Sequence, residues 1–133
     1  MTTGKTKRYT PVTVRDTRAV PFESAEEAWF WFIQAQQARS EGASPADGSL
    51  YPRPCEPIDI LKILDRLYRH RRLLRDHLLV LRHYGRRTMA PDPHRVKEMR
   101  AHRLWHEALE RIEEVLVCKG IVARNVYYLE AAE

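Results

Sequence analysis

The stretch PIDILKILDRLYRHRRLLRDHLLVLRHYG, residues 57–85, decides the fold. In its first half, apolar residues recur at the spacing of one helical face: Ile60, Leu61, Ile63, Leu64, Leu67 and Tyr68. Polar residues fill the opposite face: Asp59, Lys62, Asp65, Arg66 and Arg69. Pro57 suits the first position of such a helix, because the N–H that proline lacks has no partner there. The pattern therefore predicts an amphipathic helix from Pro57 to about residue 70.

The helical periodicity breaks at residues 70–73. If the helix continued, it would bury Arg71, Arg72 and Arg75 and expose Leu73. We therefore expect a turn here, although no glycine or proline marks it. A further helix from about Leu74 is expected to end at Gly85 and to bury four residues: Leu74, Leu78, Leu81 and Tyr84.

Toward the N-terminus, Ser24 and Glu27 form the S-x-x-E pattern of a capping box, which predicts the start of a helix. This helix should run to about Glu41, with Gly42 in the left-handed position after its end. Its centre is apolar on all sides, which indicates deep burial or a partner surface. For the aromatic cluster Trp29, Trp31 and Phe32, a place in the core is favoured over a protein interface.

Toward the C-terminus, Asp92 and Pro93 are typical of a helix start, and Gly120 is typical of a helix end. A helix is therefore expected from Pro93 to about residue 118 or 119. It should bury the stripe Ala101, Trp105, Ala108, Leu109, Ile112 and Leu116, whereas Val96 and Met99 lie off this stripe.

These elements predict an all-α protein, a small bundle of about four helices. Residues 1–22 are expected to form a flexible, disordered basic arm, residues 23–122 a single helical domain, and residues 123–133 a short irregular or extended tail. The longest apolar run, residues 29–33, is far too short to cross a bilayer, and no apolar segment follows the N-terminal charges. Cys55 and Cys118 lack metal-type spacing and indicate reduced thiols in a cytoplasmic protein with no membrane partner.

Residues that could carry chemistry are sparse. His102 and His106 lie four apart, a spacing that can hold a metal, but the glutamate of H-E-x-x-H is missing and further ligands are needed. Cys118 lies beside Lys119 near the buried stripe, which favours a structural cysteine. No phosphate-binding glycine loop and no G-x-S-x-G pattern is present. We therefore expect no enzyme activity, no catalytic residue, no metal and no cofactor.

Charge is the strongest functional signal. The net charge is +5, and residues 66–103 hold eleven Arg and one Lys against three acids. The N-terminal residues add Lys5, Lys7, Arg8, Arg15 and Arg18. Segregated positive charge indicates a polyanionic partner, although a solvated basic face is the alternative. The candidate nucleic-acid-binding residues are Arg69, Arg71, Arg72, Arg75, Arg86, Arg87, Arg95, Lys97, Arg100 and Arg103.

The expected function is that of a nucleic-acid-binding accessory or transcription-associated protein, with double-stranded DNA as the favoured partner. The positive end of the helix after Pro93 would add to the attraction for phosphate. The loop at residues 85–92 is long for a helix-turn-helix motif, which uses three or four residues. The alternative is a non-enzymatic protein–protein adaptor, oligomeric or phage-associated, that uses the aromatic first helix. The sequence leaves the oligomeric state open.

Several strings resemble a family of small uncharacterised bacterial proteins, from which no function carries over: AWFWF (28–32), RPCEP (53–57), LYRHRRL (67–73), HYGRR (83–87), MAPDP (89–93), ALERIEEVL (108–116) and KGIV (119–122). The helix organisation is also similar to sigma-factor region four and to phage late-gene antiterminators. That similarity implies DNA binding and contact with RNA polymerase or another protein. The sequence departs from both at residues 86–92, where their helix-turn-helix is missing, so the resemblance supports phosphate binding rather than base readout.

Overall fold

The computed structural model describes residues 19–42 and 52–124. Four α-helices and one short 3₁₀-helix make up this part of the chain: α2 (Ala25–Ser40), α3 (Pro57–Arg69), α4 (Arg75–Arg86), η1 (Val96–Glu98) and α5 (Met99–Cys118). Within the described ranges there is no strand, only an isolated parallel bridge between Phe22 and Val122. The predicted all-α bundle of about four helices is therefore confirmed.

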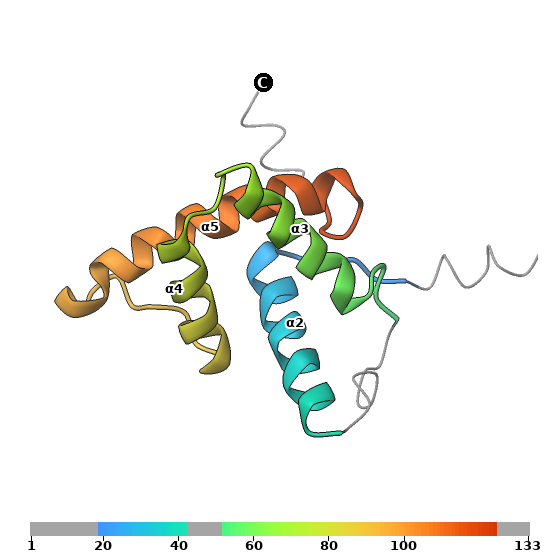
Figure 1. Ribbon diagram of the computed structural model, residues 1–133, viewed down its shortest axis with the longest axis horizontal. Helices are drawn as coiled ribbons and strands as arrows, with labels where there is room; N and C mark the ends of the chain where they lie inside the picture. Colours follow the sequence, from blue (N-terminus) through green and yellow to red (C-terminus); the bar gives the residue numbers. More distant parts are fainter. Residues whose placement is uncertain (1–18, 43–51, 125–133) are drawn as a thin grey trace, which may run out of the picture.

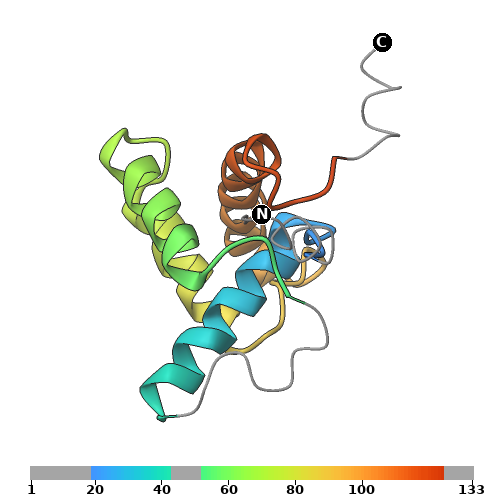
Figure 2. The same cartoon turned by 90° about the vertical axis from the view of Figure 1, so that its right-hand side faces the viewer.

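Helix α5 is the centre of the packing. It contacts α2, α3 and α4, and its contact with α4 is the most extensive. In Figure 1, α5 runs across the molecule, α2 and α4 descend from it, and α3 runs diagonally past the upper end of α2, on the side away from α4. The view turned by 90° shows α5 nearly end-on, with α3 and α4 together on one side of it (Figure 2). None of the helices in residues 19–42 and 52–124 is long and apolar enough to cross a membrane.

The aromatic cluster of α2 lies mainly in the core, as the sequence indicates. Trp29 and Phe32 are buried, and Phe30 and Trp31 are half-buried against the same core. The Trp29 indole Nε1–H donates to the Leu81 carbonyl oxygen at 2.9 Å, which joins α2 to α4. A buried indole needs such an acceptor, because an unpaired N–H would cost free energy.

Phe22 corrects the expected arm boundary. It was expected at the end of a flexible arm, but it is fully buried. Its N–H donates to the Ile121 carbonyl at 2.9 Å, and its carbonyl accepts from the Ala123 N–H at 2.8 Å. The packed body therefore begins before residue 23. Residues 1–18 and 125–133 lie outside the described residues, so the rest of the arm and most of the tail stay predictions.

The ends of α2 follow the predicted signals. The Ser24 Oγ accepts from the Glu27 N–H at 3.2 Å, as in a capping box. The Glu27 carboxylate accepts from the Glu23 N–H at 2.7 Å, one residue earlier than the motif requires. Gly42 has φ +87° directly after the C-cap, the left-handed position in which glycine is unstrained.

The predicted break after α3 is confirmed by a turn that contains Arg71 at φ +61°. The Arg72 N–H donates to the Leu67 carbonyl at 2.8 Å, and the Arg71 N–H donates to the Tyr68 carbonyl at 3.1 Å. These two bonds form a Schellman motif, which satisfies the last carbonyls of α3. The turn directs Leu73 into the core, where it is fully buried.

Individual burial predictions for α3 and α4 were partly wrong. Leu61 and Tyr68 of α3 are exposed, and Leu74, just before α4, is 55% exposed. Their side chains lie at the margin of the apolar face, where none of the helices in residues 19–42 and 52–124 covers them. His77 is 2% exposed in place of Leu74, because the buried side of α4 follows the four-residue spacing from Leu73.

The predicted start of α5 was also wrong. Asp92 does cap a backbone N–H, since its Oδ1 accepts from the His94 N–H at 2.9 Å, but it closes a turn. The Glu98 carboxylate holds this turn by accepting from the Asp92 N–H at 2.9 Å. An aspartate satisfies a turn as readily as a helix start. Helix α5 therefore begins at Met99, after η1, and ends at Cys118 near Gly120, as predicted.

Candidate nucleic-acid interface

The ten predicted basic residues are all exposed and fall in three places. Four surround the turn between α3 and α4: Arg69, Arg71, Arg72 and Arg75. Two lie at the end of α4, Arg86 and Arg87. The other four lie in and before α5, but Arg95 and Lys97 precede that helix and only Arg100 and Arg103 belong to it. Of the four basic residues that were expected in the opening turns of the last helix, only two therefore lie in that helix.

Ion pairs reduce the free charge of this set. Four of its members have carboxylate partners, and two of these pairs join separate elements. Arg72 lies 3.1 Å from the Glu114 carboxylate, and Arg100 lies 2.9 Å from that of Asp76. Local pairs join Arg69 to Asp65 at 3.1 Å and Arg95 to Asp92 and Glu98 at 3.9 and 3.8 Å. Exposed pairs of this kind are weak, but a phosphate would have to replace the carboxylate.

A row of arginines along α4 is free of such pairs. We call Arg75, Arg82 and Arg86 the α4 stripe. They lie seven and four residues apart, so they share one side of the helix. All three are exposed, and none forms an ion pair with an acid in the described segments.

Arg82 is a candidate that the sequence prediction missed. The prediction grouped arginines by the turns and loops near them, and Arg82 lies in the middle of a helix. Arg82 follows Arg75 by seven residues and precedes Arg86 by four, and these spacings match helical periodicity. This pattern in the sequence is the signal that places the three arginines on one side of a helix. Arg71 precedes the stripe in the turn, and Arg87 follows it with its guanidinium 5.9 Å from the centre of the Tyr84 ring.

A buried histidine fixes α4 against α5 and so positions the stripe. His77 Nδ1 accepts from the Leu74 N–H at 3.0 Å at the start of α4. The other ring nitrogen, Nε2, therefore carries the proton of the neutral ring and donates to Glu107 Oε1 at 3.0 Å. This hydrogen bond, together with the positive charges of Arg111 and Arg103, holds the pKa of the Glu107 carboxyl below its usual value.

Arg111 of α5 extends this network to the turn. Its guanidinium donates to the Arg72 carbonyl oxygen at 3.1 Å and lies 3.4 Å from His77 Nε2. The turn that carries Arg71 and Arg72 is thus bound to the middle of α5. Arg75, the first arginine of the α4 stripe, therefore follows a turn that is held by hydrogen bonds to side chains of α4 and α5.

The histidine pair of α5 does not assemble a metal centre in the described part of the chain. The rings of His102 and His106 stack with their centres 6.3 Å apart, and His106 lies 3.5 Å from the Glu110 carboxylate. His102 Nδ1 is buried without a hydrogen-bond partner among the residues described. No group of three or more metal-binding side chains occurs in residues 19–42 and 52–124. Cys55 is half-buried and Cys118 is exposed, and both are free thiols.

Comparisons with known proteins find no match: no family model fits the chain, and no curated protein or solved structure is significantly similar to it. The resemblance to small bacterial proteins and the likeness to sigma-factor and antiterminator helices therefore stay predictions.

Proposed function

We propose that this protein binds nucleic acid, with duplex DNA as the favoured partner, through the α4 stripe and its flanking residues Arg71 and Arg87. The observation that carries this proposal is the row of three exposed arginines on one side of α4, without carboxylate partners in the described segments. Guanidinium groups bind phosphate oxygens strongly, because their donors match the geometry of the oxygens. An accessory role in transcription stays a prediction.

The dimensions of α4 support this assignment. From Arg75 to Arg86 the helix rises about 16 Å, which is enough to reach phosphates on both sides of a groove. The major groove of DNA is about 12 Å wide and admits one helix. Only one side of α4 is buried, toward α5 and α2, so the side that carries the arginines faces solvent.

The ion pairs predict a ranking among the basic residues. A stripe arginine can bind phosphate without losing a protein contact, whereas Arg72 and Arg100 must first leave Glu114 and Asp76. The stripe should therefore contribute more to affinity than the paired arginines. Contacts of this kind are made to the backbone and supply affinity rather than sequence preference.

The test is a salt titration of binding to fluorescent duplex DNA, single-stranded DNA and RNA, measured by anisotropy. The triple variant R75Q/R82Q/R86Q should bind duplex DNA at least tenfold more weakly at low salt. It should also lower the slope of log affinity against log salt by roughly 2.7, since each lost phosphate contact contributes about 0.9.

The matched control is K62Q/R66Q/K119Q, which removes three charges from α3 and from the end of α5 instead. It should lose much less affinity than the stripe variant, because only the general attraction of positive charge changes. Equal effects of the two triple variants would contradict a defined interface on α4. Failure of the wild-type protein to bind any of the three nucleic acids at low salt would overturn the proposal altogether.

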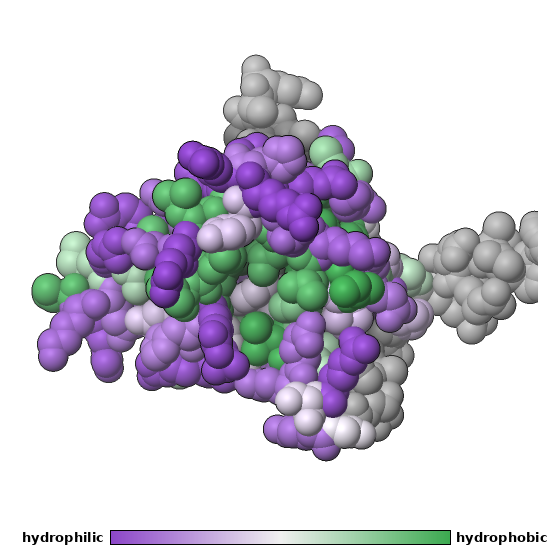
Figure 3. Space-filling model, viewed as in Figure 1, coloured by the Kyte–Doolittle hydropathy of each residue, from purple (hydrophilic) through white to green (hydrophobic). Residues whose placement is uncertain are grey.

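A protein–protein adaptor is the second candidate function, and exposed apolar side chains favour it. Leu61, Tyr68 and Leu74 are exposed on and beside α3 and α4. In Figure 3, apolar surface is visible in the middle of the face, where α2, α3 and α4 come together. The expected aromatic contact surface is reduced, since Trp29 and Phe32 are buried. This function predicts loss of partner binding in L61S/L74S, with nucleic-acid affinity unchanged.

A further inference from the structure

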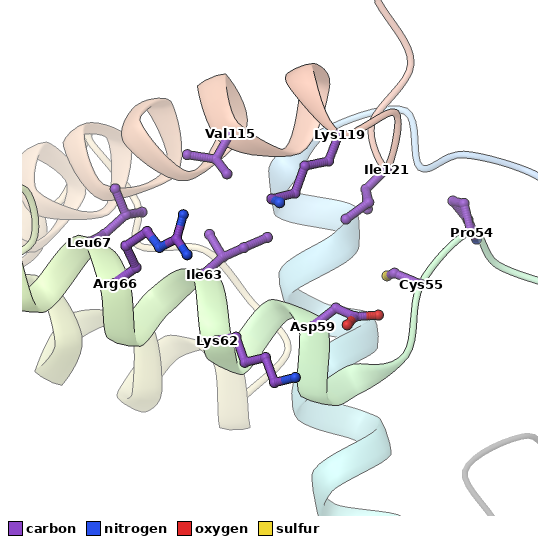
Figure 4. A pocket seen from close by; sticks show the side chains of 10 residues that line it. All are labelled: Pro54, Cys55, Asp59, Lys62, Ile63, Arg66, Leu67, Val115, Lys119 and Ile121. Atoms are coloured by element: carbon purple, nitrogen blue, oxygen red, sulfur yellow. The ribbon is translucent and has the colours of Figure 1, made fainter.

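A cavity of about 250 Å³ lies between α3 and the C-terminal end of α5 (Figure 4). Three basic side chains line it, Lys62 and Arg66 from α3 and Lys119 from the end of α5. None of the three is part of the α4 stripe, and none forms an ion pair with an acid among the described residues. The cavity is therefore a separate concentration of unpaired positive charge.

The basic groups converge from two helices. Figure 4 shows the Arg66 guanidinium and the Lys119 amine reaching from opposite sides toward the same space over Ile63, while Lys62 extends below α3, away from both. Lys62 lies one helical turn before Arg66 and adds a third positive charge to the lining. The acid that lines the cavity, Asp59, leaves a net lining charge of +2 (three basic groups less one acid). This balance suits a ligand that carries about two negative charges.

The wall of the cavity is apolar. Ile63 and Ile121 are buried, and Val115 packs against the same core from α5. A free inorganic anion would leave this wall without a contact, whereas a ligand with an apolar group would cover it and gain from the burial. The volume lies just below the range of roughly 300 to 1,000 Å³ that holds drug-sized ligands. It therefore suits a small molecule.

The acidic end of the cavity sets the direction in which such a ligand would lie. Asp59 Oδ2 accepts from the Glu56 N–H at 2.8 Å, which fixes this carboxylate at the start of α3. In Figure 4 it points toward Cys55 and away from Arg66. Burial, with the charges of Asp59 and Glu56, raises the pKa of the Cys55 thiol to about 11, so the thiol is neutral near pH 7. An anionic group is thus directed toward Arg66 and Lys119.

We propose that this cavity binds a small organic phosphate whose phosphate group lies between Arg66 and Lys119 and whose apolar group covers Ile63 and Val115. Arginine holds a phosphate through two parallel hydrogen bonds, and lysine adds a point charge. Because α4 takes no part, this binding is independent of the nucleic-acid proposal.

The test titrates the full-length protein with phenyl phosphate, inorganic phosphate and benzoate, followed by calorimetry and by amide NMR shifts. Phenyl phosphate should bind best, since it alone combines two charges with an apolar ring. The double variant R66Q/K119Q should bind it roughly tenfold more weakly, because each exposed charge contact contributes up to about fivefold. D59N should bind it two- to threefold more tightly, roughly the effect of removing one exposed like charge.

R75Q/R82Q is the matched control, because it removes two positive charges from α4 and none from the cavity. It should retain wild-type affinity for phenyl phosphate. Equal affinity for phenyl phosphate and inorganic phosphate would overturn the role of the apolar wall. No binding at millimolar concentration, or unchanged binding by R66Q/K119Q with a wild-type melting temperature, would overturn the site.

Discussion

Gly85 lies inside the last turn of α4, against Trp29 and Ile33 of α2. A Cβ atom built at this position would lie 2.7 Å from Trp29 Nε1 and 3.0 Å from Ile33 Cγ1. The absence of a side chain therefore lets the Trp29 ring lie against α4 and donate to the Leu81 carbonyl. Glycine was expected to end this helix, but here it serves close packing.

Gly85→Ala should destabilise the protein by about 1 to 3 kcal/mol, the usual effect of overpacking a core, because the Trp29 ring must move and its hydrogen bond weaken. Urea unfolding followed by circular dichroism measures the change. Arg86→Ala, at the next and exposed position, is the control and should change stability by less than about 0.5 kcal/mol. If Gly85→Ala were as stable as the wild type, the α2–α4 contact would be looser than these distances indicate.

Single residues also mark the limit of prediction from helical spacing. The spacing of Ile60, Ile63 and Leu67 correctly predicted the buried side of α3. It also predicted burial of Leu61 and Tyr68, which are exposed. Periodicity gives the direction of an apolar face, but its margins are covered only where another helix lies against them. That depends on packing between distant segments, which the sequence of one helix does not contain.

At the scale of elements, the turn after α3 was predictable and the start of α5 was not. The turn changes the phase of the apolar pattern, so burial of Leu73 and exposure of Arg71 required it. Asp92, by contrast, has a side chain that can cap either a helix or a turn. Here Glu98 determines that Asp92 caps a turn, because its carboxylate accepts from the Asp92 N–H, six residues earlier in the chain.

The contact between α4 and α5 includes the His77–Glu107 hydrogen bond and should respond to pH. A carboxyl whose pKa is lowered by folding adds stability above the pKa it has in the unfolded chain. For Glu107 that value is about 4.5, and the added stability is lost as the pH falls through the lower folded pKa.

Glu107→Gln should therefore lower stability near pH 7 and flatten its dependence on pH below about 4.5, because the titrating group is gone. The measurement is the midpoint of urea unfolding at a series of pH values. Glu110→Gln is the control, as Glu110 lies on the same helix, is exposed and pairs only with exposed His106 among the described residues. An unchanged pH profile for Glu107→Gln would show that His77 and Glu107 do not couple folding to pH.

For the whole molecule, the clustering of positive charge was visible in the sequence, but its distribution was not. Arg72 and Arg100 are paired with Glu114 and Asp76, which are 42 and 24 residues away along the chain. Such pairs follow from the packing of α4 on α5 and could not be predicted from local patterns. The unpaired arginines instead form a row along α4, and a second basic group surrounds the α3–α5 cavity. The positive charge of the protein, +5 in net, thus gathers at two separate candidate sites, the α4 stripe and the α3–α5 cavity.

Phe22 joins the segment before α2 to the segment after α5. Its ring centre lies 5.1 Å from that of Trp31, and the Arg53 guanidinium lies 4.4 Å from its ring centre. Its backbone N–H and carbonyl form hydrogen bonds with Ile121 and Ala123. Phe22 therefore connects the beginning of the helical body to its end. Because Ile121 also lines the α3–α5 cavity, the position of Phe22 bears on that cavity as well.

Phe22→Ala should destabilise the protein by about 3 to 5 kcal/mol, the usual effect of removing a buried phenyl group, since both ends of the body lose the same core contact. Phe22→Leu, which keeps most of the apolar volume, should lose less, about 1.5 kcal/mol or below. Val20→Ala, at an exposed position two residues earlier, should change little. Urea unfolding compares the three variants. If Phe22→Ala matched Val20→Ala, residues 19–22 would not belong to the packed body, and the boundary near residue 22 would stand as the sequence first predicted it.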